Sequence, residues 1–135
     1  MRKICLNCEK GEMVHGVRDV PYEYRGQQTI ISKVSGWHCS VCEEIEFDKG
    51  EGTRFSEEIR KFSDEVDKKE AAELVRIRKK LRLTQRQAAV LTGGGPNAFS
   101  RYERGKAKPM SATINLFRLL NKHPELLDEL RSDCS

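Results

Sequence analysis

Two pairs of cysteines, each separated by two residues, constrain this chain more than any other feature. Cys5 and Cys8 form the first pair, and Cys39 and Cys42 form the second. Two intervening residues allow a tight turn to direct both sulfurs at one ion, and two such turns supply the four thiolates of a tetrahedral Zn²⁺ site. The spacing therefore predicts one structural zinc ion per chain, with no open coordination position for a substrate.

Two other uses of these cysteines stay open at this point. A redox-active CxxC is usually a single motif near a βαβ pattern, whereas these two motifs lie in a short, turn-rich segment. Two disulfides would require an exported protein, but the chain begins Met1-Arg2-Lys3 and reaches a cysteine without an apolar signal segment. No run approaches the ~18 apolar residues of a membrane span. We therefore expect a reduced, cytoplasmic protein with no membrane partner, in which CxxC pairs bind metal more often than they cross-link.

The fifth cysteine and the histidines add little to this prediction. Cys134 lies alone in a polar tail, and we expect it to be an incidental exposed thiol. His38 precedes Cys39 and is near enough in sequence to reach the metal, but four cysteines already fill the site. No Ser/His/Asp or Cys/His arrangement indicates nucleophilic catalysis, so we do not expect an enzyme.

Charge divides the chain into two parts. Residues 1–62 carry a net charge of −1, and residues 63–135 carry +5. Between positions 74 and 122, twelve Lys or Arg residues are accompanied by a single acidic residue, Glu103. Because a solvated surface normally mixes both signs, this local charge of +11 indicates a polyanionic partner, and we expect nucleic acid. We predict two domains, residues 1–66 and 67–135, with the charged stretch 63–70 as a linker that is at least partly helical.

The first domain is predicted to be small and to contain short strands beside the metal. Tyr22–Gly26 alternates aromatic and polar residues and Thr29–Val34 is rich in β-branched residues, so together they predict a β-hairpin. Glu44–Phe47 predicts a further strand, and apolar residues at helical spacing from Glu51 predict a helix that runs toward the linker. A domain of about sixty residues buries little apolar surface, so the metal would supply the missing constraint.

The second domain is predicted to be helical throughout. From residue 70 the apolar residues recur with a period of 3.6, in a stripe of Leu74, Ile77 and Leu81. Thr84, followed three residues later by Gln87, is a capping box that begins a short helix, and glycines 93–95 end it. Pro96 is expected in the first turn of a third helix, which Gly105 ends. Two short helices joined by a glycine turn, within a basic segment, are typical of a helix-turn-helix.

The third helix carries the residues that would read DNA. At 100° per residue, Asn97, Arg101 and Arg104 share one face, and the aromatic residues Phe99 and Tyr102 lie opposite. Asn pairs bidentately with adenine and Arg with guanine in the major groove, so this face is predicted to contact base edges. The early position of Asn97 and Arg101 fits a recognition helix that enters the groove by its N-terminal end.

Residues beside this face are predicted to contact the DNA backbone. Ser100 flanks the stripe and would bond to a phosphate or a base, and Lys106 and Lys108 follow the helix as phosphate contacts. A fourth helix is expected from Ser111 and a short last helix from Pro124, both with apolar residues that are chiefly core. Any surplus apolar face would form a homodimer seam, since helix-turn-helix proteins commonly read paired half-sites.

The order of these parts resembles the MqsA family of antitoxins, which joins a YgiT-type zinc finger to a helix-turn-helix of the XRE type. The resemblance covers nearly the whole chain and depends on the two CxxC pairs and on the runs Gly11–Val14, Asp19–Tyr22, Arg25-Gly26, Arg78–Leu81, Leu83–Gln85, Gly93–Glu103 and Lys122–Leu127. It implies that Cys5, Cys8, Cys39 and Cys42 bind zinc and that Asn97 and Arg101 read bases. It also implies a zinc domain that neutralises a cognate mRNA-cleaving toxin of the MqsR type, and a dimeric DNA-binding domain that represses its own operon.

We therefore expect an α+β protein that is an antitoxin and autorepressor, with operator DNA and an RNase toxin as partners. A stand-alone helix-turn-helix regulator, whose zinc domain serves dimerisation or another partner, is the main alternative, and a thiol enzyme is a second. Independently of the resemblance, a nearly neutral zinc domain beside a strongly basic one is better suited to a protein than to DNA. Its hairpin offers a sheet edge for pairing, and Tyr22, Tyr24 and Trp37 would be interface anchors wherever they are exposed.

Overall fold

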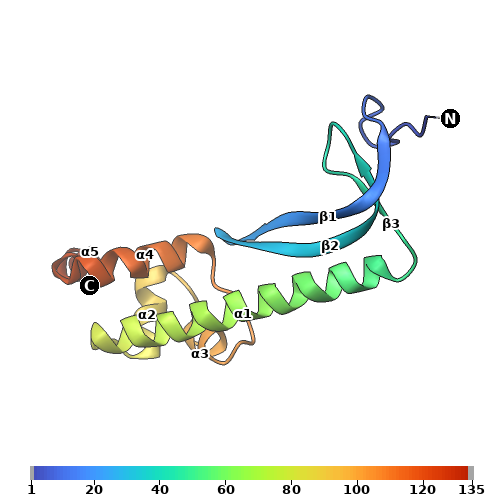
Figure 1. Ribbon diagram of the computed structural model, residues 1–135. Coiled ribbons are helices and arrows are strands. Elements are labelled where there is room, and N and C mark those ends of the chain that lie inside the picture. The colour runs from blue at the N-terminus through green and yellow to red at the C-terminus, as the bar shows by residue number, and fades with distance from the viewer. Residues whose placement is uncertain (1, 134–135) are drawn as a thin grey trace. The chain divides into compact units, whose positions relative to one another are not determined.

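The chain has a mixed α+β fold, which confirms the predicted fold class. The computed structural model describes residues 2–133, so the expectation for Cys134 concerns a residue outside this range. In chain order the elements are β1 (Met13–Tyr24), β2 (Gln27–Cys39), β3 (Ile45–Phe47), α1 (Glu51–Lys80), α2 (Gln85–Thr92), α3 (Ala98–Glu103), α4 (Ser111–Lys122), the 3₁₀ helix η1 (Pro124–Leu126) and α5 (Leu127–Asp133) (Figure 1). Contacts divide the chain into two compact units, Met1–Asp64 (unit 1) and Glu65–Ser135 (unit 2).

Unit 1 is built on a long antiparallel hairpin of β1 and β2, with β3 paired to the other edge of β2. The hairpin turn is Arg25-Gly26, whose φ angles of 49° and 79° are the positive values that a two-residue type I′ turn requires. The strands extend well beyond the predicted hairpin, and Met13 pairs with Cys39 at the far end. The sequence did not show this length because most residues of β1 are exposed, so apolar alternation is weak along it.

A β-bulge at Asp19 attaches the hairpin to the start of α1. The Asp19 carboxylate accepts a hydrogen bond from the Lys33 N–H at 2.9 Å, and Lys33 has a positive φ of 54°. The guanidinium of Arg54 donates to the carbonyls of Ser32 at 3.1 Å and Lys33 at 2.9 Å. The bulge thus receives a fixed contact from the first turn of the helix, which holds the hairpin in register.

Helix α1 is one continuous helix of 30 residues. The stretch 63–70, predicted as a linker that is at least partly helical, is helical throughout. It contains neither Pro nor Gly, and Glu and Lys are good helix formers, so nothing in it interrupts the backbone hydrogen bonds. The border between the two units lies within this helix.

The start and end of α2 and the end of α3 agree with the sequence analysis. The side chain of Thr84 accepts from the Gln87 N–H at 3.0 Å, and the Gln87 side chain accepts from the Thr84 N–H at 2.9 Å, which confirms the capping box. Gly93 ends α2 with φ 74°, and Gly105 follows α3 with φ 73°. Both glycines adopt the left-handed conformation that residues with a Cβ rarely tolerate.

The position of Pro96 corrects one expectation. It does not lie in the first turn of the third helix, because α3 begins two residues later at Ala98. Instead, Pro96 is the second residue of a turn in which the Ala98 N–H donates to the Gly95 carbonyl at 3.0 Å. Proline suits this turn position because its φ is already fixed near the required value. Asn97 is consequently the residue just before α3, with its side chain free of any cap hydrogen bond.

The core of unit 2 is formed by residues from α1 to α5. Phe99 and Phe117 are fully buried, with ring centroids 5.1 Å apart. The other buried members of this cluster are Leu74, Ile77, Leu81, Leu83, Ala88, Ala89, Ile114, Leu120 and Leu127. The apolar stripes of the predicted helices are therefore core. None of the helices in residues 2–133 combines the length and apolar character needed to cross a membrane.

Candidate metal centre and nucleic-acid interface

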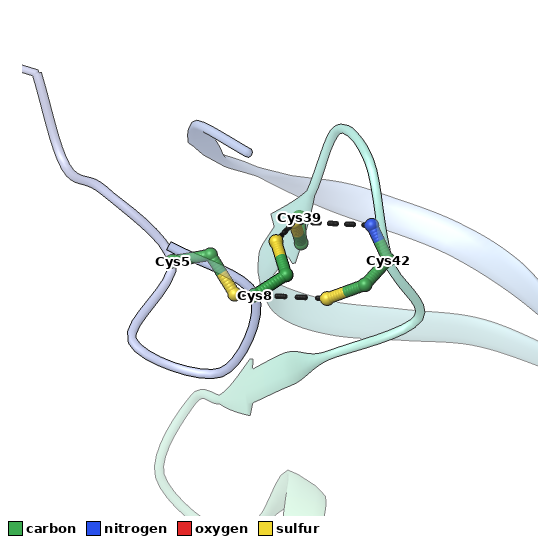
Figure 2. A group of neighbouring side chains, drawn as sticks. All are labelled: Cys5, Cys8, Cys39 and Cys42. Carbon is green, nitrogen blue, oxygen red and sulfur yellow. Dashed lines mark hydrogen bonds between the residues drawn. The ribbon is translucent and has the colours of Figure 1, made fainter. Parts of the chain in front are cut away.

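Two loops bring the four predicted metal ligands together. Cys5 and Cys8 lie in the N-terminal loop, and Cys39 and Cys42 lie at the end of β2 and in the loop that follows (Figure 2). The N-terminal loop folds back on itself and onto the start of β1: the Cys5 N–H donates to the Gly11 carbonyl at 2.8 Å, and the Met13 N–H donates to the Lys3 carbonyl at 2.7 Å. The hairpin register that pairs Met13 with Cys39 then places both loops at the same end of the sheet.

The sulfur positions match a tetrahedral site. All four Sγ atoms lie within 4.8 Å of one another. The Cys5–Cys42 sulfurs are 3.6 Å apart and the Cys8–Cys39 sulfurs are 3.7 Å apart. Four Zn–S bonds of about 2.3 Å in a regular tetrahedron would put neighbouring sulfurs about 3.8 Å apart. These distances also far exceed the roughly 2.05 Å of a disulfide bond, so the four residues are arranged as free thiol ligands around one point.

Backbone N–H groups are directed at the sulfurs and favour the thiolate form. The N–H groups of Lys10 and Gly11 lower the pKa of Cys8 to about 6, and the Gly11 N–H lies 3.3 Å from its sulfur. The N–H groups of Cys42 and Val41, at 3.3 and 3.4 Å, lower the pKa of Cys39. Metal ligation requires deprotonated cysteine, so this hydrogen bonding prepares the knuckles for a cation.

Burial makes Cys5 the ligand whose thiolate most needs a nearby positive charge. The Cys8 N–H lowers the pKa of Cys5, but burial and the nearby sulfurs of Cys42 and Cys39 raise it, and the result is a pKa of about 11. Cys5 is only 1% exposed, so water cannot solvate a thiolate there. Four thiolates at this spacing require a compensating positive charge, and a divalent metal ion would supply it.

Gly11 is required by the close packing of the site. It is buried, and a Cβ built on it would overlap the Cys39 sulfur. Trp37 packs partly buried against the cluster, and the ammonium of Lys3 lies 4.4 Å from its ring centroid. His38 is buried and its Nε2 lies 3.1 Å from the Val34 carbonyl, so its ring is engaged with the backbone. The sequence indicated the four ligands but not this supporting shell.

The predicted DNA-contacting residues lie together on and beside α3. Phe99 is fully buried and Tyr102 half-buried in the core, while Asn97, Arg101 and Arg104 are exposed. The predicted division of the helix into an aromatic inner face and an Asn–Arg–Arg outer face is therefore present. Ser100 is half-buried, and its carbonyl accepts from Arg104 Nε at 3.2 Å.

Most of the positive charge of unit 2 is exposed and unopposed. Twelve basic residues lie between positions 74 and 122, and three of them are in ion pairs. The pairs are Arg78 with Glu103, Lys108 with Asp67 and Arg118 with Glu73. The remaining nine are exposed and form no ion pair with any residue in 2–133: Arg76, Lys79, Lys80, Arg82, Arg86, Arg101, Arg104, Lys106 and Lys122. Such a surface attracts a polyanion.

The three paired residues include one of the predicted phosphate contacts. The Lys108 ammonium lies 3.1 Å from the Asp67 carboxylate of α1, whereas Lys106 is exposed and unpaired. Lys108 is therefore partly neutralised, which the sequence did not indicate because the partner lies 41 positions earlier.

Glu103, the single acidic residue of the basic segment, forms a buried ion pair with Arg78 within unit 2. Arg78 Nε donates to Glu103 at 2.8 Å and its terminal nitrogen donates at 3.0 Å, in a bidentate pair whose side chains are 12% and 8% exposed. Arg78 also donates to the Leu83 carbonyl at 2.8 Å, and Gln85 donates to Glu103 at 3.3 Å. This network joins the end of α1 and the start of α2 to α3, so it fixes the helix that carries Asn97 and Arg101.

The aromatic residues considered as toxin anchors are not freely exposed. Tyr22, Tyr24 and Trp37 are all half-buried. The Tyr22 ring packs edge-on against Phe62 of α1 at 6.2 Å. Tyr22 and Trp37 therefore have packing partners within unit 1, and only part of each of the three side chains is accessible to a partner.

His15, Ser35 and Asp48 form a polar cluster at the sheet that the sequence analysis did not predict. Asp48 accepts a hydrogen bond from the Ser35 hydroxyl at 2.6 Å, and His15 Nε2 lies 2.8 Å from the same carboxylate. Both contacts lower the pKa of Asp48, and the hydrogen bond from Ser35 has the larger effect. The carboxylate stands between the hydroxyl and the imidazole, so the histidine has no contact through which to activate the serine as a nucleophile.

Relatives of this chain are known along nearly its full length. Residues 1–131 match the family described as the antitoxin component of bacterial toxin-antitoxin systems, MqsA. The antitoxin MqsA of Escherichia coli (strain K12) is 46% identical over 129 residues, which cover 94% of this chain and 98% of that protein. The solved N-terminal domain of the E. coli protein MqsA is 36% identical, with a TM-score of 0.42 over 47% of this chain and 94% of that one.

Proposed function

Because this chain belongs to the MqsA family, the antitoxin components of bacterial toxin-antitoxin systems, we propose that unit 1 neutralises a toxin and unit 2 represses the operon. The toxin is an mRNA-cleaving RNase of the MqsR type, and the DNA is the operator of the antitoxin's own operon. The observation that carries the proposal is the separation of features: the cysteine cluster lies in a nearly neutral unit, and the exposed Asn97/Arg101 face lies in a strongly basic one.

Zinc is the metal that we propose for the cysteine cluster. Four thiolates with tetrahedral spacing suit Zn²⁺, and the supporting N–H···S bonds are those of a closed structural site. Cys5, Cys8, Cys39 and Cys42 would hold the ion, which supplies a cross-link between the N-terminal loop and the loop after β2. Elemental analysis should find about one zinc per chain.

Unit 2 is proposed to place α3 in the major groove. The exposed side chains of Asn97 and Arg101 have the chemistry to read base edges, with Arg104 beside them. Ser100, Lys106 and Lys108 are proposed as backbone or flanking contacts, and Lys108 would exchange its Asp67 partner for phosphate. The glycine turn and the Arg78–Glu103 pair keep the helix fixed while the long side chains remain free to reach DNA.

A homodimer through unit 2 is proposed from its exposed apolar residues. Val90, Met110 and Leu119 are 55%, 72% and 49% exposed, respectively, so apolar surface remains outside the core. Dimers of helix-turn-helix proteins bind half-sites about one helical turn, or a multiple, apart. Sedimentation equilibrium with and without operator DNA would measure the stoichiometry.

Operator binding by variants of the full chain tests the DNA assignment. Replacement of Arg101 by Ala should cost about 1–3 kcal/mol on the operator and relax specificity at one base position per half-site. Replacement of Lys106 by Ala should weaken binding evenly on operator and scrambled DNA, with a smaller salt dependence. If Arg101→Ala bound operator and scrambled DNA as the parent does, α3 would not be the reading helix.

Toxin neutralisation is tested in cells that express the RNase of the same operon. The parent chain and Arg101→Ala should both restore growth, because Arg101 lies in unit 2 and its replacement leaves unit 1 unchanged. Cys39→Ser should fail to restore growth while unit 2 still binds operator DNA. Failure of the parent to restore growth would favour a stand-alone regulator without a toxin partner.

A further inference from the structure

Unit 1 contains a groove that its metal site and hairpin do not require. One hollow of about 700 Å³ lies along the hairpin, and a second of about 500 Å³ extends from it to the cysteine loop, β3 and α1. The two hollows share the lining residues Pro21, Tyr22 and Glu43, so they adjoin. We call them together the acidic groove, because Glu23, Glu43 and Glu44 line them.

The floor of the groove is apolar and held in place by ring contacts. Tyr22 packs against Phe62 at 6.2 Å, and Phe47 packs against Phe55 at 5.0 Å. Ile30 at one end of the groove is 65% exposed, and Phe47 at the other end is 36% exposed. Apolar surface that is already ordered costs little conformational entropy on binding, which suits it to a protein partner.

The rim of the groove carries carboxylates that form no ion pair among the described residues. Glu23, Glu43 and Glu44 are exposed lining residues and form no ion pair with any residue in the described part of the chain. Arg18 is the one Lys or Arg among the described residues that line the two hollows, and the other basic side chain, His38, is buried. By contrast, ion pairs engage four other carboxylates of unit 1: Glu12 with Arg2, Glu46 with Lys3, Asp48 with His15 and Glu51 with Arg54.

From this geometry we propose that the acidic groove receives a Lys- or Arg-rich segment of the toxin, with an apolar side chain against Tyr22 and Phe47. The inference rests on the proposed function, because an enzyme that cleaves mRNA must present positive charge to a polyanion. Such a protein is repelled by the basic surface of unit 2 and attracted to the unpaired carboxylates of unit 1. Complementary potential of this kind sets the orientation and rate of association.

The metal site positions one wall of the groove. The Glu44 N–H donates to the Cys42 sulfur at 3.4 Å, and the Cys39 N–H donates to the Glu44 carbonyl at 3.1 Å. The Glu43 and Glu44 carboxylates therefore project from the second metal knuckle. Loss of the metal would displace both charges, so toxin binding requires the loaded site even though the metal contacts no partner.

Calorimetric titration of the full, metal-loaded chain with the purified toxin of its operon tests this proposal. The test variant is Glu43→Lys with Glu44→Lys. The control is Glu57→Lys with Asp64→Lys, which makes the same change in net charge at α1 positions outside the groove. We expect the test variant to bind about 10- to 100-fold more weakly, with a smaller salt dependence, and the control to stay within about threefold of the parent. Zinc content and thermal midpoint, equal in all three, show that the variants are folded.

The outcomes separate this inference from the proposed function. If the parent does not bind the toxin at all, the proposed function itself fails. If the parent binds and the test variant binds equally well, or the control loses as much affinity, the toxin docks elsewhere and the acidic groove is not its site. Selective weakening of the test variant, accompanied by a similar loss in Ile30→Ala, supports docking in the groove.

Discussion

Replacement of Glu103 by Ala should destabilise unit 2 strongly, because Glu103 is the acceptor of a buried ion pair. The variant removes the carboxylate that accepts two hydrogen bonds from Arg78, at 2.8 and 3.0 Å. Arg78 would keep only its hydrogen bond to the Leu83 carbonyl. Because the Arg78 side chain is 12% exposed, water reaches its guanidinium poorly and cannot replace the lost partner.

The expected cost follows from this burial. Removal of one partner from a buried ion pair costs about 3–5 kcal/mol, since it leaves an uncompensated charge. Residual exposure of 12% and 8% lets some water in, so we expect the lower end of that range, about 3 kcal/mol. For a unit of this size the midpoint of thermal unfolding should fall by about 12–24 °C.

Thermal and urea unfolding of the full chain would measure the effect. Circular dichroism follows mainly the helices of unit 2, and fluorescence of Trp37, the single tryptophan, follows unit 1 as an internal control. Glu73→Ala is the matched comparison, because it removes a bidentate pair with Arg118 whose side chains are 25% and 40% exposed. That exposed pair should contribute no more than about 1 kcal/mol.

A second variant distinguishes a lost ion pair from general damage. The double variant Arg78→Met with Glu103→Leu replaces the buried charges by apolar side chains and should recover most of the lost stability. If Glu103→Ala cost less than about 1 kcal/mol, or the double variant were no more stable than the single one, the buried pair would not have the role assigned to it.

Three further predictions concern the metal site and the acid response. Gly11→Ala should lower metal affinity at least tenfold, as measured by chelator competition, because the added methyl overlaps the Cys39 sulfur and the site must distort; unchanged affinity would contradict the packing argument. Removal of zinc with a strong chelator should abolish NMR dispersion of unit 1 while the helical signal of unit 2 persists; a folded metal-free unit 1 would contradict a structural role. The Arg118 hydrogen bond lowers the pKa of Glu73, so the pair stabilises the protein above the ordinary pKa of 4.5, and this contribution is lost as the pH falls below it. Between pH 3 and 7 the free energy of unfolding, measured with denaturant, should therefore change less in Glu73→Gln than in the parent, with a difference below about 1 kcal/mol.

Features set by neighbouring residues were predictable from the sequence. The capping box of Thr84 and Gln87 and the left-handed glycines 93 and 105 each depend on contacts within one turn, and the structure contains all of them. Convergence of the two CxxC pairs was also predictable, although the pairs lie far apart, because the chemistry of one ion requires four ligands.

Features that depend on distant partners were not predictable. The 12-residue strand β1 is mostly exposed, so its pairing with β2 left little apolar pattern to detect. The pairs Arg78–Glu103 and Lys108–Asp67 join residues whose separations follow no helical or strand period. Continuity of α1 was anticipated only in part. The stretch 63–70 was expected to be at least partly helical, but apart from Val66 it is largely charged, which is the composition of a linker, and its residues nevertheless favour helix.

Inhibition of the toxin's RNase activity by a fragment of residues 1–64 is the most direct test of the central claim, that the two units have separate functions. The metal-loaded fragment should inhibit RNA cleavage with a potency close to that of the full chain and should not bind operator DNA. The complementary fragment, residues 65–135, should bind the operator and leave the toxin active. If the fragment of residues 65–135 inhibited the toxin, or the fragment of residues 1–64 failed to inhibit it, the division of function proposed for this antitoxin would be contradicted.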